Sequence, residues 1–231
     1  MNTEIDTTKS NIDQFDYRKS MKKTSNNNFL NTIIKVERYI NRPLASLIVR
    51  AVFNTRVTPN GLTYFSFLLG ITGAFFFSRG EYLYFVLGGA FAQLASIVDC
   101  ADGMLARAKD MCSDFGSHLD LLLDRISDFF IMVGISAGCY FFFKNINLLL
   151  LGLFAAGLYQ LQIHLYYLTN SYLQVKEKGQ TGEARALLFM LLLIFSIANR
   201  LDIFLYGLLA QTVIVNVVRL IYFITLGKKK A

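Results

Sequence analysis

The chain has 231 residues, of which 54% are hydrophobic and 17% charged, and its mean hydropathy is +0.43. Soluble domains carry about a quarter charged residues, so this composition excludes an ordinary soluble domain and favours an integral membrane protein. The formal net charge of +7 is interpreted as membrane orientation and attraction to anionic lipid, and not as nucleic-acid binding.

Residues 1–28 are polar, rich in Asn, Ser, Thr and Lys, and predict a disordered cytoplasmic tail. Residues 29–56 predict an amphipathic helix in the membrane interface, broken at Pro43, although a soluble amphipathic arm fits the same pattern. The apolar stripe of this segment consists of Ile33, Val36, Ile40, Leu44, Leu47 and Ile48.

The region 57–231 predicts one all-α membrane domain with six transmembrane helices. A bilayer needs about 20 apolar residues per helix, and lipid-facing backbone must satisfy its own hydrogen bonds. The six apolar runs are 61–79, 82–106, 119–143, 147–168, 186–200 and 203–226, and the fifth is the shortest.

Basic residues predict the orientation of these helices, because they concentrate on the cytoplasmic side of membrane proteins. Most of the 23 lysines and arginines lie in the N-terminal region, the 107–118 and 169–185 loops, and the C-terminal tail. The intervening loops hold Arg79, Lys144 and Arg200. Both termini and the 107–118 loop are therefore expected to face the cytoplasm.

Four carboxylates stand at helical spacing around that loop. Asp99 and Asp102 end the second apolar run, and Asp120 and Asp124 begin the third. A short connection folds the two helices antiparallel, so both pairs are expected in one cavity. Carboxylates at membrane depth mark functional sites, and sites made only of oxygen ligands favour Mg²⁺ or Mn²⁺. Two such ions bridged by shared carboxylates suit phosphoryl chemistry.

The neighbouring residues suit a phosphate-bearing substrate. Gly103 and Ala106 are small and let a ligand approach the helix. Arg107 offers a planar fork of donors for phosphate oxygens, and Ser113 offers a hydroxyl. Gly116 allows a turn into the third helix.

Two further features lie in the third apolar run. Asp128 extends the face of Asp124 and is expected to pair with Arg125 or Arg219, or to support the metal ligands from behind. Gly134 and Gly138 permit close helix packing, either within the chain or between two copies.

The pattern D-x-x-D-G-x-x-A-R, eight residues, G-x-x-x-D-x-x-x-D resembles the signature of the CDP-alcohol phosphatidyltransferase family. Its defined positions are Asp99, Asp102, Gly103, Ala106, Arg107, Gly116, Asp120 and Asp124. The segment Thr58-Pro59-Asn60-Gly61-Leu62-Thr63 is similar to the T-P-N-x-x-T sequence at the start of the family's first span. The six-span layout also agrees with this family.

The resemblance implies an enzyme of phospholipid biosynthesis that acts as a homodimer. Such an enzyme transfers a substituted phosphate from a CDP-linked donor, commonly CDP-diacylglycerol, to a small alcohol and releases CMP. It implies one ion held by Asp99, Asp102 and Asp120, a second held by Asp99, Asp120 and Asp124, and Asp124 as the base. The implied residues for the CDP part are Asn60, Thr63, Gly103, Arg107 and Ser113, with Ala106 and Gly116 beside them.

The segment 124–128, Ser171-Tyr172 and Arg185 resemble the members that use an inositol phosphate, such as phosphatidylinositol phosphate synthases. Gln174 stands where those members carry a basic residue. Lys176, Lys178 and Arg185 fit either a pocket for the acceptor phosphate or ordinary cytoplasmic positive charge.

Three alternatives stay open at this point. The acceptor is an inositol phosphate or, as in phosphatidylglycerophosphate synthases, glycerol 3-phosphate. The donor is CDP-diacylglycerol or a soluble CDP-alcohol such as CDP-inositol. The rival class is a cation transporter, which needs polar residues through several spans, whereas the runs after about residue 130 hold almost none.

Overall fold

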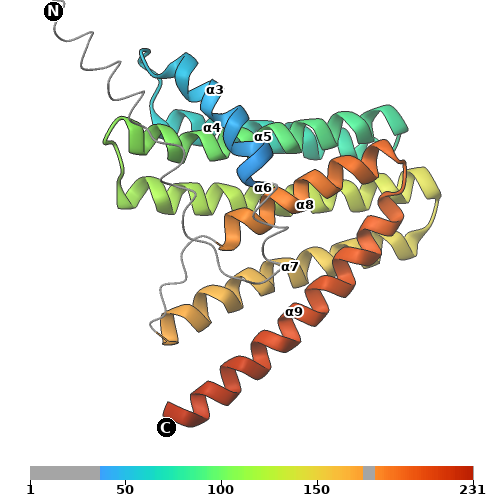
Figure 1. The fold of residues 1–231 in the computed structure, drawn as a ribbon. Helices are drawn as coiled ribbons and strands as arrows, with labels where there is room; N and C mark the ends of the chain where they lie inside the picture. The colour runs from blue at the N-terminus through green and yellow to red at the C-terminus, as the bar shows by residue number, and fades with distance from the viewer. Residues whose placement is uncertain (1–36, 174–179, 231) are drawn as a thin grey trace, which may run out of the picture.

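The computed structural model describes residues 37–173 and 180–230, and every regular element in that part of the chain is helical (Figure 1). The elements are a π-helical turn η2 (Glu37–Asn41), α3 (Arg42–Val52), α4 (Pro59–Ser78), α5 (Tyr82–Ala108), α6 (Asp114–Phe143), α7 (Ile146–Leu173), α8 (Gln180–Ile197) and α9 (Leu201–Lys230). Residues 1–28, the predicted tail, lie outside the described residues, as do Ile33 and Val36.

Within the described residues, five helices are long and apolar enough to cross a membrane. They are Pro59–Ser78, Tyr82–Ala108, Asp114–Phe143, Ile146–Tyr172 and Leu201–Thr225. The remaining predicted span, 186–200, lies largely in α8, whose apolar part Ala184–Ile197 is shorter. The fold is thus consistent with an integral membrane helical protein, while a sixth span stays a prediction.

Polar side chains fix where the first and third spanning helices begin. Thr58 caps α4 by accepting a hydrogen bond from the Gly61 N–H (3.2 Å), and Pro59 occupies the first turn. Ser113 caps α6 in the same way by accepting from the Gly116 N–H (3.0 Å). Because of this cap, α6 begins before the apolar run that predicted it.

The helices α4, α5 and α6 lie side by side (Figure 1), and glycines allow two of these backbones to approach closely. A Cβ added at Gly134 would overlap the Ala74 carbonyl oxygen, and one at Gly138 would overlap the Phe77 carbonyl oxygen. These two glycines of α6 therefore pack against α4 within the chain. The main apolar core, which includes Phe77 and Phe85, lies against this contact.

The helix α3 packs on α5 through Ala45, which is fully buried, and through Ile48. Leu44 and Leu47, assigned to the same stripe, point outward and are 43% and 60% exposed. Exposed leucines on a short helix suit a membrane interface. Pro43 lies in the first turn of α3, directly after the π-helical turn η2, where its missing N–H costs little.

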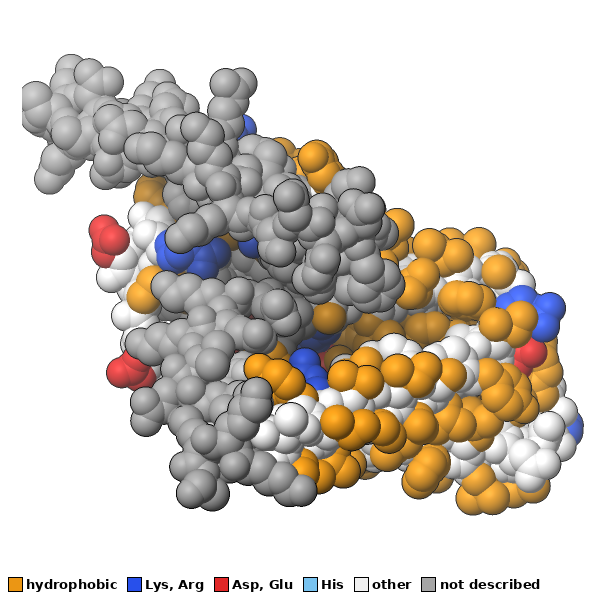
Figure 2. All heavy atoms as spheres, turned by 60° about the horizontal axis from the view of Figure 1, so that its bottom comes forward, with side chains coloured by type: hydrophobic (Ala, Val, Ile, Leu, Met, Phe, Trp, Pro, Cys, Tyr) orange, Lys and Arg blue, Asp and Glu red, His pale blue; other side chains and the backbone are white. Residues whose placement is uncertain are grey.

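The loops segregate to the two ends of the molecule. The α5–α6 loop and the C-terminal ends of α7 and α9 lie at the left in Figure 1, opposite the α4–α5, α6–α7 and α8–α9 loops. Figure 2 shows apolar side chains over most of the described surface between the ends, with most charged side chains near them. The segments expected on one side of the membrane thus share one end of the fold.

Candidate active site

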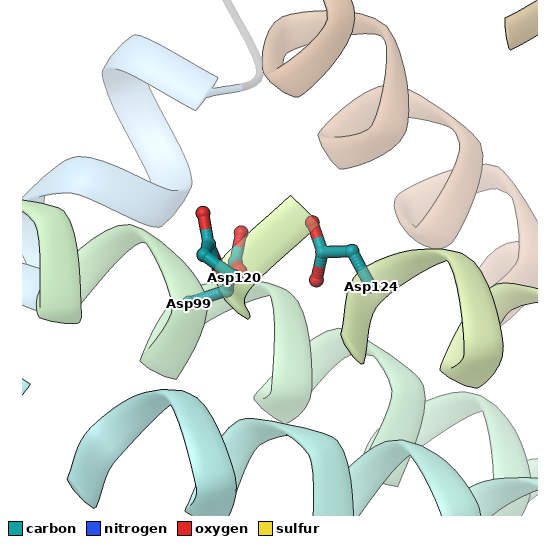
Figure 3. Close-up of side chains that lie close together, drawn as sticks. All are labelled: Asp99, Asp120 and Asp124. Atoms are coloured by element: carbon teal, nitrogen blue, oxygen red, sulfur yellow. The ribbon is translucent and has the colours of Figure 1, made fainter. Parts of the chain in front are cut away.

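Three carboxylates meet where the last turns of α5 face the first turns of α6. Asp99 comes from α5, and Asp120 and Asp124 come from α6, with their side chains turned toward one another (Figure 3). One carboxylate oxygen from each lies within 4.8 Å of the other two. This arrangement arises because α5 ends and α6 begins at the same short loop. Each helix carries its acids on the side that faces the other helix.

Asp102, the fourth predicted ligand, lies one turn further along α5 and faces α4. It is 6% exposed, and its Oδ2 accepts a hydrogen bond of 2.6 Å from the Thr63 hydroxyl. Thr63 was expected beside the substrate, and here it holds a carboxylate of the cluster. The place of Asp102 among metal ligands stays a prediction, since the group of three nearest oxygens does not include it.

The three acids fit a hard divalent cation. Among the described residues, Asp99 Oδ1 and Asp120 Oδ1 are buried and have no hydrogen-bond partner. Buried carboxylate oxygens without donors are costly, and several carboxylates together repel one another in a low-dielectric site. Mg²⁺ and Mn²⁺ prefer such oxygen ligands, and either ion would relieve both costs.

Arginine side chains supply positive charge behind the acids. Arg185 of α8 is 4% exposed, and its Nη1 lies 2.7 Å from Asp124 Oδ1 and 3.1 Å from Asp99 Oδ2. Its Nε donates a 3.0 Å hydrogen bond to Asp128, which is fully buried. Arg125 lies 3.5 Å from the other oxygen of Asp128. The expected pairing of Asp128 with Arg125 is therefore present, while that with Arg185 was not expected.

Several residues predicted for the donor gather at the ends of α4, α5 and α6. A Cβ on Gly116 would lie 3.0 Å from Ser113 Oγ and 3.1 Å from Asn60 Oδ1, so these three residues adjoin. The Arg107 guanidinium lies back over Gly103, 3.5 Å from where a Cβ would stand. Arg107 is exposed, so its guanidinium is accessible to a ligand.

Ala106 is half-buried on α5 beside Arg107. Of the residues predicted for the acceptor, Lys176 and Lys178 lie outside the described residues. Arg185 is described and contacts Asp99, Asp124 and Asp128, and its part in an acceptor site stays a prediction.

Two contacts beside the site were not predicted from the sequence. The Arg185–Asp128 pair joins residues 57 apart, and no local pattern connects them. Lys109 follows α5 and donates to the Thr55 and Val57 carbonyls (3.0 and 2.9 Å), which ties down the loop before Asn60. A lysine in a basic loop gives no sign of such a contact.

A model of the CDP-alcohol phosphatidyltransferase family matches residues 56–223. The "Bifunctional IPC transferase and DIPP synthase" of Rubrobacter xylanophilus is 41% identical over 103 residues, 45% of this chain and 23% of the relative. The "Archaetidylinositol phosphate synthase" of Pyrococcus horikoshii is 32% identical over 105 residues, 45% of this chain and 53% of the relative. The chain thus spans about a quarter and about half of the lengths of these relatives.

Solved structures of the Mycobacterium tuberculosis phosphatidylinositol phosphate synthase share the fold. The form with CDP-DAG bound has a TM-score of 0.65 at 21% identity and covers 80% of this chain and 94% of that one. The form with manganese and citrate has a TM-score of 0.66 and covers 80% and 90%. Since the family model spans most of the chain, including all the acids of the cluster, the protein belongs to the CDP-alcohol phosphatidyltransferase family.

Proposed function

We propose that this protein transfers a substituted phosphate from CDP-diacylglycerol to an alcohol that itself carries a phosphate, preferably an inositol phosphate, and releases CMP. The observation that carries the proposal is the group of three acids from α5 and α6 within 4.8 Å of one another, inside the family's signature. The names of the relatives as inositol phosphate synthases support the choice of acceptor.

Asp99, Asp102, Asp120 and Asp124 would hold Mg²⁺ or Mn²⁺, with two ions as the expected number. The structure of the mycobacterial relative with manganese supports this assignment. Bound there, the cation would neutralise the pyrophosphate and stabilise the leaving phosphate. The unpartnered oxygens of Asp99 and Asp120 are available for it.

The protein's own residues bind the donor and move the proton. Arg107 presents its guanidinium to phosphate oxygens, while Asn60, Ser113 and Gly116 form the adjoining part of the donor site. The alcohol oxygen forms a bond to the phosphorus that carries the lipid, and the bond from that phosphorus to CMP breaks. Asp124 takes the proton of the alcohol.

Orientation and assembly belong to the same proposal. The acids belong to the last turns of α5 and the first turns of α6, beside the basic α5–α6 loop, and this supports a site at the cytoplasmic face. The donor reaches them from the surrounding membrane lipids. A homodimer is the assembly we propose from membership of the family.

The test is CMP release by the purified protein in detergent with CDP-diacylglycerol or CDP-inositol as the donor. The acceptors compared are inositol 1-phosphate, free inositol and glycerol 3-phosphate, with Mg²⁺, Mn²⁺ or a chelator. We expect release that needs both inositol 1-phosphate and a divalent ion, and none from Asp124→Asn despite retained donor binding. CMP release with glycerol 3-phosphate but not with inositol 1-phosphate would show that glycerol 3-phosphate is the acceptor. Turnover by Asp124→Asn would show that Asp124 is not the base.

A further inference from the structure

We propose that Arg185 acts as a tethered counter-cation, which takes the place of a divalent ion at Asp124 and yields that place when the ion binds. This inference rests on the proposed metal site and adds a competition between the ion and a side chain of the chain itself. It also gives Asp128 a positioning role, because Asp128 holds the arginine at the edge of the site.

The two halves of the Arg185 side chain are held differently. Its Nε makes a hydrogen bond of 3.0 Å with Asp128. Its Nη1 lies 2.7 Å from Asp124 Oδ1 and 3.1 Å from Asp99 Oδ2, but makes no well-aligned hydrogen bond with any described residue. The first contact is therefore a directed bond, and the second is a charge contact that an ion can replace.

The Nη1 of Arg185 contacts two of the three acids that would hold the metal ion. Asp99 and Asp124 both belong to the group of three acids, and Nη1 lies between them. A guanidinium and a divalent ion bound to the same two carboxylates repel each other, since both are cations. Binding of the ion is therefore expected to weaken the contact between Nη1 and Asp124.

The anchor of Arg185 is separate from that contact. Asp128 is fully buried, and its second oxygen is 3.4 Å from the Tyr159 hydroxyl and 3.5 Å from Arg125. The guanidinium also lies 4.9 Å from the Phe189 ring centre, one turn further along α8. The arginine therefore stays at the site with a free edge, where an anionic acceptor can meet it. Ion binding thus favours acceptor binding, and the converse holds by linkage.

The experiment measures Mn²⁺ affinity in detergent, without substrate, by electron paramagnetic resonance of the free ion. The variants are Arg185→Gln and, as the matched control for loss of one charge in the same cluster, Arg125→Gln. Arg125 approaches Asp124 only to 3.7 Å. We expect Arg185→Gln to bind Mn²⁺ roughly tenfold more tightly or better, because the ion no longer competes with a cation 2.7 Å from Asp124 Oδ1. Arg125→Gln should change the affinity much less.

Arg185→Lys keeps the net charge and serves as the test variant if Arg185→Gln does not fold. A single ammonium cannot bond Asp128 while it bridges Asp99 and Asp124, so Mn²⁺ should bind more tightly at constant charge. No gain in the Arg185 variants, or equal gains in Arg185→Gln and Arg125→Gln, would overturn the inference alone. A wild-type protein that binds no Mn²⁺ would overturn both the inference and the proposed function.

Discussion

Replacing Thr63 by Val removes the hydroxyl that bonds Asp102 and keeps the shape of the side chain. The bond is 2.6 Å long, and both residues are buried, so Asp102 loses a donor that water cannot replace. A hydrogen bond to a charged group contributes about 1.5–3 kcal/mol. A loss of about 2 kcal/mol lowers the folded-to-unfolded ratio roughly 30-fold and the melting temperature by about 4–8 °C.

The assay is thermal unfolding in detergent, together with Mn²⁺ affinity. Thr72→Val is the matched control, because the Thr72 hydroxyl donates to the Leu68 carbonyl of its own helix (2.8 Å) and should cost much less. Thr63→Ser keeps the hydroxyl and should recover most of the stability. If Thr63→Val has the same melting temperature as the wild type, the Thr63 hydroxyl does not stabilise the fold through Asp102.

Three further changes probe the scaffold. Gly138→Ala should lower the free energy of unfolding by about 1–3 kcal/mol, because the added methyl group meets the Phe77 carbonyl. Gly157→Ala is the control, since a Cβ there meets no described atom within 4 Å. Equal melting temperatures for the two variants would contradict this packing. Asn41→Leu should lower the free energy of unfolding by about 1–3 kcal/mol, since it leaves the buried Gln93 and Ser96 without their 2.9 Å hydrogen bonds to Asn41. Amide hydrogen exchange in α3 should become faster. Unchanged exchange would show that these bonds do not hold α3 on α5. Lys109→Met should raise the KM for the CDP donor with little change in kcat, because it removes the hydrogen bonds that hold the loop before Asn60. A fall in kcat without a change in KM would contradict this role of Lys109.

The apolar runs predicted where the long helices lie, because length and hydropathy decide which segments can satisfy their backbone inside a bilayer. They predicted the ends less well. The polar first turn of α6 begins at Asp114 under the Ser113 cap, where hydropathy gives no signal. The apolar stripe of α3 also gave no sign that Ala45 is the contact buried against α5, while Leu47 faces outward.

The acids of the site follow from helical spacing on two helices joined by a short loop, which is local information. The contacts that support them are not local. Arg185 reaches Asp128 from a distant helix, and Lys109 bonds backbone carbonyls, which carry no sequence pattern. Only the packing of α8 beside α5 brings that arginine among the carboxylates.

The central claim is that Asp99, Asp120 and Asp124 together hold a divalent ion at the meeting point of α5 and α6. Anomalous diffraction at the manganese edge, from crystals grown with Mn²⁺, tests it most directly. The account predicts an anomalous peak within coordination distance of carboxylate oxygens from all three residues, and its loss in Asp120→Asn. An ordered site without a peak, or a peak bound elsewhere, would contradict the account.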